Sequence, residues 1–152
     1  MWIAVAICHD EPISEGMTSA RIDFGTAERF LSLRRALGVE AFGLNQLTLQ
    51  PRQRGRIHRH RSQEEVYLVL AGTLTLIVER EDHALEAGEL ARVPARVRRR
   101  LENRGSEPCV LVAIGAAGEH VGRDGEAFES WEEREGRPPQ EVPLPDDLPA
   151  PT

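Results

Sequence analysis

The chain contains no lysine, and all 19 of its basic residues are arginine. It has two cysteines, Cys8 and Cys109, which are too few for a disulfide framework and lack the paired spacing of zinc and redox motifs. We therefore expect a reducing compartment. Cys109 opens the apolar run "CVLVAIGA" and is interpreted as a small buried hydrophobic residue.

Long hydrophobic runs are also missing. None approaches the length needed to cross a bilayer, and the first residues, "MWIAVAIC", lack the basic region and cleavage site of a signal peptide. One hypothesis is that the stretch before Met17 is an upstream extension and that "MTSARIDF" is the native start. These features predict a cytoplasmic protein with no membrane partner.

Several catalytic motifs are absent as well. The sequence has no nucleophile elbow, no phosphate-binding glycine loop and no CxxC motif, so covalent catalysis is not supported. The formal net charge is −6, yet residues 51–104 carry 12 arginines against 8 acidic residues. A locally basic region in an acidic protein predicts an electropositive pocket or rim rather than a nucleic-acid footprint. No nucleic-acid partner is expected.

The length of 152 residues predicts one domain with extensions. We divide it into an N-terminal extension with a helix (1–41), a barrel (42–118) and an acidic Pro-rich C-terminal arm (119–152). The helix is expected over "TAERFLSLRRAL", residues 26–37, with Thr26 as N-cap and Gly38 just past its end.

After the helix the pattern changes to short segments rich in Val, Leu, Ile and Thr, separated by turns. We expect strands over eight segments: 42–49, 56–60, 65–72, 73–79, 83–87, 90–94, 98–103 and 109–116. Short strands in this number favour a closed or sandwiched antiparallel structure, most economically a small barrel.

The C-terminal arm holds 6 of the 10 prolines between residues 138 and 151. Such a segment cannot build its own core, so it is either disordered or laid across the barrel, and we favour a docked arm. Phe128 and Trp131, three residues apart, have the spacing of one helical face and are interpreted as packing anchors.

The segment "RIHRHRSQEEVYL" carries the residues with metal-binding chemistry. Residues two apart in a strand point the same way, so His58 and His60 project together. Glu65, at the start of the next strand, could complete a face of two histidines and one carboxylate, with Glu64 as the competing residue. Such a face suits Fe, Mn, Ni, Cu or Zn and leaves open positions for a ligand.

These residues resemble the first motif of the cupin superfamily, in the run Gly55, His58, His60, Glu65 and Gly72. The second motif is similar to "GELARVPARVRRRLEN", where Gly88, Pro94 and Asn103 match, Arg96 replaces the second glycine and Arg99 replaces the histidine.

The resemblance implies a mainly β fold, a cupin-type double-stranded β-helix (jelly-roll) barrel, and the metal ligands His58, His60 and Glu65. It also implies a homodimer. Pairing of two copies would cover exposed strand edges, which gives a physical reason for a dimer. Related activities include dioxygenases, isomerases and decarboxylases, so a metal-dependent enzyme is one reading.

Arg99 leaves two hypotheses open, because arginine has no lone pair for a metal. In the first, a divalent ion binds the triad and Arg99 holds the carboxylate or phosphate of an anionic small molecule. In the second, no metal binds, Glu65 pairs with Arg99, and the barrel is a ligand-binding or sensory module. Strand alternation places Tyr67 in the same pocket, and Gln46 or Asn45 faces it from the preceding strand. We list Arg99, Tyr67 and Gln46 as ligand-binding residues.

The other charged positions receive a simpler interpretation. The arginines in the run from Arg52 to Arg61 are expected to form a solvated rim. His9, His83 and His120 lack ligand spacing and are expected at the surface.

Overall fold

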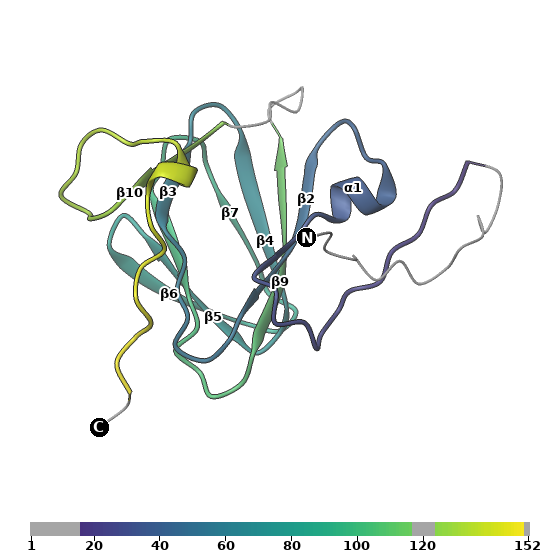
Figure 1. The fold of residues 1–152 in the computed structure, drawn as a ribbon, viewed down its shortest axis with the longest axis horizontal. Coiled ribbons are helices and arrows are strands. Elements are labelled where there is room, and N and C mark those ends of the chain that lie inside the picture. Colours follow the sequence, from purple (N-terminus) through teal and green to yellow (C-terminus); the bar gives the residue numbers. More distant parts are fainter. Residues whose placement is uncertain (1–15, 117–123, 151–152) are drawn as a thin grey trace.

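The computed structural model describes residues 16–116 and 124–150, which form two five-stranded antiparallel sheets that face each other (Figure 1). The first sheet has the order β1 (Phe30–Leu31), β2 (Gly43–Leu49), β9 (Cys109–Ala116), β4 (Glu64–Ala71) and β7 (Leu90–Val93). The second has the order β10 (Gly125–Phe128), β3 (Ile57–His60), β8 (Arg99–Glu102), β5 (Thr73–Val78) and β6 (Glu81–Glu86). This arrangement confirms the predicted mainly β jelly-roll barrel.

The hydrophobic core lies between the two sheets. Alternate residues of each strand point inward, so the apolar positions of β4, β5 and β9 meet at the centre. The buried cluster consists of Leu49, Tyr67, Val69, Leu74, Leu76, Val93, Leu101, Cys109, Leu111 and Ala113. Burial raises the pKa of the Cys109 thiol to about 11, which confirms its role as an unreactive core residue.

All eight predicted strands are present within one or two residues of their expected ends. Two further strands, β1 and β10, come from the segments before and after the barrel and pair with β2 and β3 at the sheet edges. Both are too short for an alternating pattern to show in the sequence. Their pairing covers backbone groups that an open edge would leave unsatisfied.

The predicted helix over residues 26–37 is wrong in its first half. Helix α1 spans only Leu33–Leu37, with Ser32 as N-cap and Gly38 in the left-handed conformation just past its end. Thr26 instead accepts a hydrogen bond from the amide of Glu28 in a turn. A short isolated helix is marginal, and pairing of Phe30 and Leu31 with β2 satisfies backbone groups that the helix would otherwise use.

The C-terminal arm is docked on the barrel, as the sequence predicts. It runs along the second sheet in extended form after the short 3-10 turn η1 (Pro139–Glu141), seen in yellow in Figure 1. The amide of Leu148 donates to the carbonyl of Arg52, and Nε of Arg54 donates to the carbonyl of Asp146. These bonds tie the arm to the segment that precedes β3.

Phe128 and Trp131 do not share a helix, which corrects that part of the prediction. Phe128 ends strand β10 and Trp131 follows in a turn. The Phe128 ring is 1% exposed and lies between the guanidinium groups of Arg59 and Arg98, at 5.3 and 5.6 Å from the ring centre. Phe128 is therefore a packing anchor, as expected.

Two turn positions correspond to glycines of the motifs. Gly72 has φ 73°, and a Cβ there would lie 2.4 Å from the carbonyl oxygen of Pro108, so no other residue fits. Arg96 stands where the second motif has glycine and adopts φ 67°. A side chain in this left-handed region is strained.

His83 is exposed on β6, as predicted, whereas His9, His120 and Cys8 lie outside the described residues. Within the described part of the chain, no helix is both long and apolar enough to cross a membrane.

Candidate metal centre

Strand β3 presents His58 and His60 to the same side of the second sheet. Their rings lie edge to face with centres 5.6 Å apart, as expected for residues two apart on one strand. β3 pairs with β8 on one side and with β10 on the other, so both neighbours fix its direction. The two imidazoles thus enter the space between the sheets together.

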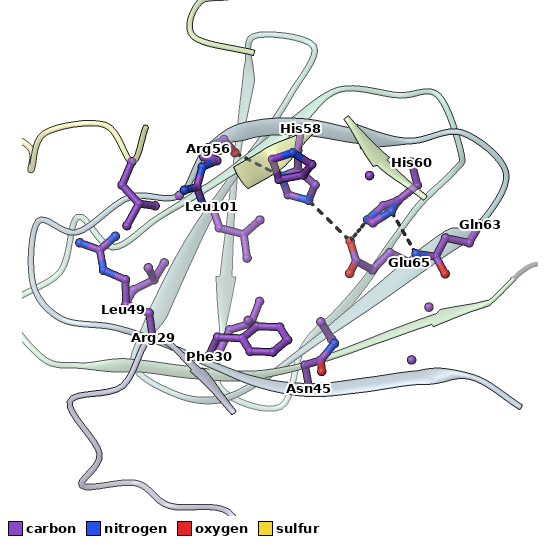
Figure 2. Close-up of a pocket in the computed structure, with 18 residues that line it drawn as sticks. Arg29, Phe30, Asn45, Leu49, Arg56, His58, His60, Gln63, Glu65 and Leu101 are labelled. Carbon is purple, nitrogen blue, oxygen red and sulfur yellow. Dashed lines mark hydrogen bonds and ion pairs between the residues drawn. The ribbon is translucent and has the colours of Figure 1, made fainter. Parts of the chain in front are cut away.

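Glu65 approaches the histidines from β4 of the opposite sheet (Figure 2). Its Oε2 lies 3.2 Å from Nε2 of His60 and 3.8 Å from Nε2 of His58. Glu64, the competing residue, points outward and pairs with Arg92. Strand alternation therefore separates the two glutamates as the sequence predicts.

The spacing of the three donor atoms fits a metal ion. One ligand atom from each of His58, His60 and Glu65 lies within 4.8 Å of the others. Donors bound at about 2.1 Å to one tetrahedral or octahedral ion stand about 3.0 to 3.4 Å apart, so only small movements would be needed. Nδ1 of His58 donates to the carbonyl of Arg56 at 3.2 Å, which leaves its Nε2 with the lone pair that a metal requires.

His60 is held in a different protonation pattern. The amide nitrogen of Gln63 lies 3.0 Å from Nδ1 of His60, and the amide oxygen is buried without a partner among the described residues. With Gln63 donating to Nδ1, the neutral ring carries its proton on Nε2 and donates to Glu65. Turning the amide over would let Oε1 accept from Nδ1 and would free Nε2 for a metal.

Tyr67 contacts the triad from within the core rather than from the cavity. Its hydroxyl donates to Oε2 of Glu65 at 2.5 Å and lies 3.4 Å from Nε2 of His58. Burial and the Glu65 charge raise the pKa of Tyr67 well above its usual value, so the hydroxyl keeps its proton. Burial would raise the pKa of the Glu65 carboxyl, but its contacts with His58 and His60 hold it well below its usual range.

Arg99 occupies the position of the missing histidine, but its guanidinium forms no ion pair with Glu65. The side chain is fully buried, and Nη2 donates to the carbonyls of Val93 and Pro94 at 3.3 and 3.2 Å. Nε and Nη1 have no partner among the described residues. The ion pair of the second hypothesis is therefore not formed, because the carboxylate contacts the two histidines and Tyr67 instead.

A cavity of about 350 Å³ opens beside the triad. His58, His60 and Glu65 lie at one end of it in Figure 2, Leu101 lies near its middle, and Leu49 lies beside Arg29 at the other end. The volume is at the lower end of the range for small-molecule sites. A compact ligand could therefore lie against the triad.

The ligand-binding residues predicted from the sequence are only partly at this cavity. Asn45 lines it, whereas Gln46 points to the other face of β2 and bonds to the backbone of Asp23. Arg99 and Tyr67 are not among the lining residues of the cavity either. This corrects the expected placement of Gln46, whereas ligand binding by Arg99 and Tyr67 stays a prediction.

Two arginines that the sequence did not single out as ligand residues do line the cavity. Arg29 precedes β1, and Arg56, expected in a solvated rim, precedes β3. Their placement depends on contacts with the C-terminal arm, so no local sequence pattern predicts it. A high density of arginine around position 56 was the only signal in the sequence.

The turn between β3 and β4 is fixed by a residue far along the chain. The carboxylate of Asp124 accepts from the amides of Ser62 and Gln63 at 3.0 and 2.9 Å and from the Ser62 hydroxyl at 2.9 Å. Although burial acts to raise it, these bonds lower the pKa of Asp124 below its usual value. The turn sets where Gln63 and Glu65 stand relative to His60.

Comparison with known proteins agrees with this geometry. A family model described as a cupin domain matches residues 45–115, the part that holds the triad and the sheets. The region is a cupin domain. A search of curated proteins finds no match.

Solved structures with similar folds are cupin-superfamily proteins. A sugar phosphate isomerase of the cupin superfamily from Silicibacter pomeroyi is 25% identical with a TM-score of 0.59, and the match covers 66% of this chain and 65% of that one. A cupin protein from Bacteroides fragilis is 17% identical with a TM-score of 0.59, covering 69% and 87%. A predicted oxalate decarboxylase from Thermotoga maritima is 20% identical with a TM-score of 0.52, covering 58% and 78%. The latter two establish the cupin fold alone.

Proposed function

We propose that this cupin domain binds a small anionic metabolite at a divalent metal held by His58, His60 and Glu65. The observation that carries the proposal is the convergence of three donor atoms within 4.8 Å at the end of a cavity. A bound first-row ion would act as a Lewis acid on a ligand oxygen. The protein's own contribution is orientation, because Arg56 and Gln63 hold the imidazoles and Tyr67 holds the carboxylate.

The charge balance of the site supports an anionic ligand. Glu65 contributes one negative charge at the wall of the cavity, and the fully buried Arg99 contributes one positive charge. A divalent ion would leave a net charge of about +2 in a region of low dielectric constant. An anion at the open coordination positions would offset this charge, whereas a neutral ligand would not.

Metal analysis tests the proposal. Protein purified without tag or chelator and incubated with Fe(II), Mn(II), Ni(II) or Zn(II) should retain close to one ion per chain. His58→Ala and Glu65→Gln should each abolish retention, while His83→Ala, at the exposed histidine of β6, should not. A metal content far below one ion per chain under all four conditions contradicts a metal site.

A metal-free ligand-binding module is the second proposal, and one observation favours it. A connected set of hydrogen bonds already joins Gln63, His60, Glu65 and Tyr67, and it satisfies the carboxylate without an ion. In that case the apo protein would show ligand-induced stabilisation that chelators leave unchanged. Thermal melting of ligand mixtures with and without EDTA separates the two proposals.

Catalysis belongs to the first proposal. The similarity to the sugar phosphate isomerase supports testing sugar phosphates before substrates of dioxygenases or decarboxylases. Interconversion of an aldose phosphate and a ketose phosphate by metal-loaded protein, absent from Glu65→Gln, would support an isomerase. Turnover that is equal in both proteins would contradict it.

We also propose that the protein is a homodimer. The outer face of the first sheet exposes Leu90 (61%) and Ile114 (37%), and β7 is an unpaired edge among the described strands. Light scattering should give twice the chain mass of 16.9 kDa, reduced toward one chain by Leu90→Glu. A monomeric mass for the unaltered protein contradicts this proposal.

A cytoplasmic location stays a prediction, which cell fractionation tests.

A further inference from the structure

The end of the cavity away from the triad carries positive charge. Arg29 lies at the end farthest from His60 and Glu65 in Figure 2, and Arg56 lies between Arg29 and His58. Among the described residues lining the cavity, Glu65 is the only acidic one. The cavity therefore has a carboxylate at one end and two guanidinium groups away from that end.

Both arginines are held in place by backbone carbonyls, and the contact of Arg56 uses Nε, so its two terminal nitrogens stay available. Nη1 of Arg29 donates to the carbonyl of Arg54 at 3.1 Å, and Nε of Arg56 donates to the carbonyl of Val142 at 2.5 Å. Arg54 in turn donates to the carbonyl of Asp146. These bonds place Arg29, Arg56 and the C-terminal arm at the same end of the barrel.

Neither guanidinium is neutralised by a close carboxylate. Arg29 has one acidic neighbour, Asp147, at 3.7 Å, and the Asp147 side chain is 49% exposed. Arg56 forms no ion pair with any carboxylate in residues 16–116 and 124–150. By contrast, Arg59, on the outward face of β3, is paired with Glu126 at 2.8 Å. Of the two cavity arginines, Arg56 thus has no acidic partner in the described part of the chain, and Arg29 has only this exposed one.

Part of the cavity wall is apolar. Leu49, Leu101 and Ala113 line the cavity from the strands, and the exposed side chains of Phe30 and Leu144 also line it. The apolar lining lowers the local dielectric constant beside the guanidinium groups, which strengthens their attraction for an anion. Arginine also matches the planar geometry of phosphate and carboxylate oxygens.

We propose that Arg29 and Arg56 bind the charged terminus of an elongated organic anion, a phosphomonoester or a carboxylate, whose other end lies against the triad. The triad end of this proposal rests on the function proposed above, whereas the arginine end does not need a metal. The C-terminal arm then forms part of the binding site, because it supplies Leu144 and the carbonyl that orients Arg56.

Calorimetric titration with matched probes tests the proposal. D-ribose 5-phosphate and D-ribonate should bind the intact protein at least tenfold more tightly than D-ribose, which shares their polyol body. The better of the two anions identifies the preferred terminus. Arg56→Met should reduce that preference at least fivefold, and Arg29→Met combined with Arg56→Met should abolish it.

Two controls keep the outcomes distinct. Arg59→Met removes an arginine from the other face of the same strand and should leave the preference unchanged. His58→Ala should preserve the binding of inorganic phosphate, so a failed metal site and a failed anion site give different results. If both anions bind no better than ribose, or if the double variant keeps the preference while remaining folded by circular dichroism, the proposal is overturned.

Discussion

The hydroxyl of Tyr67 donates a 2.5 Å hydrogen bond to Oε2 of Glu65 in the interior of the barrel. The same oxygen lies 3.2 Å from Nε2 of His60. Oε2 of Glu65 is therefore contacted both by the core residue Tyr67 and by His60 of the opposite sheet. This arrangement determines how the triad responds to substitution.

Tyr67→Phe should destabilise the protein by about 2 kcal/mol, because a buried hydrogen bond to a charged group is lost. In a Glu65→Gln background, Tyr67→Phe should lower the free energy of unfolding by at least about 1 kcal/mol less than it does in the unaltered protein, since the charge on residue 65 is gone. Urea denaturation of the four proteins measures this coupling. Additive effects would show that the hydroxyl and the carboxylate do not interact.

Gln63→Glu should strengthen metal binding by about tenfold. A carboxylate accepts from Nδ1 of His60 and cannot donate, so Nε2 of the ring is left with its lone pair. Gln63→Leu should weaken metal binding, because no side-chain oxygen is then present to accept a hydrogen bond from Nδ1 of His60. Titration with Mn(II) compares the three proteins, and equal affinities would contradict control of the His60 tautomer by residue 63.

Arg99→Met should raise the affinity for a divalent ion by at least about tenfold, because it removes a fixed positive charge from the core beside the triad. Arg99→His removes the same charge and adds an imidazole, so any further gain reports a fourth ligand. Arg100→Met, on the opposite face of β8, serves as control. If Arg99→Met and Arg100→Met bind Mn(II) equally, the buried charge does not oppose the metal.

Arg96→Gly should stabilise the protein by about 0.5–1 kcal/mol, because glycine adopts the observed φ of 67° without strain. Ala95→Gly is the matched control at the neighbouring position and should destabilise it, since Ala95 has no positive φ. Thermal melting measures both changes. A lower melting temperature for Arg96→Gly would show that its contact with the Arg61 carbonyl outweighs the strain.

Asp124→Asn should lower stability by about 1–2 kcal/mol at pH 7, because the carboxylate bonds to the 62–63 turn are charge-assisted. The pKa of Asp124 is lowered from 3.8 in the folded protein, so its stabilisation is complete above that pH. As the pH falls through the folded pKa, the stabilisation is lost. The unfolding free energies of the two proteins should therefore converge below pH 4, whereas Asp147→Asn, at an exposed side chain, should show no such convergence.

The sequence determined the parts of this protein that depend on local alternation. A period of two along a strand is a property of neighbouring residues, so it placed His58 and His60 together and separated Glu65 from Glu64. The eight barrel strands were predicted for the same reason. The first half of the predicted helix does not form, because pairing of Phe30 and Leu31 with β2 overrode the local preference.

Only the tertiary structure decided where long side chains end. Arg99 sits at a motif position, yet its flexible stem carries the guanidinium to carbonyls at the end of β7 rather than to Glu65. Arg29 and Arg56 are drawn to the cavity by backbone groups of distant segments, including the C-terminal arm. Such contacts join residues up to 86 positions apart, and no pattern of adjacent residues encodes them.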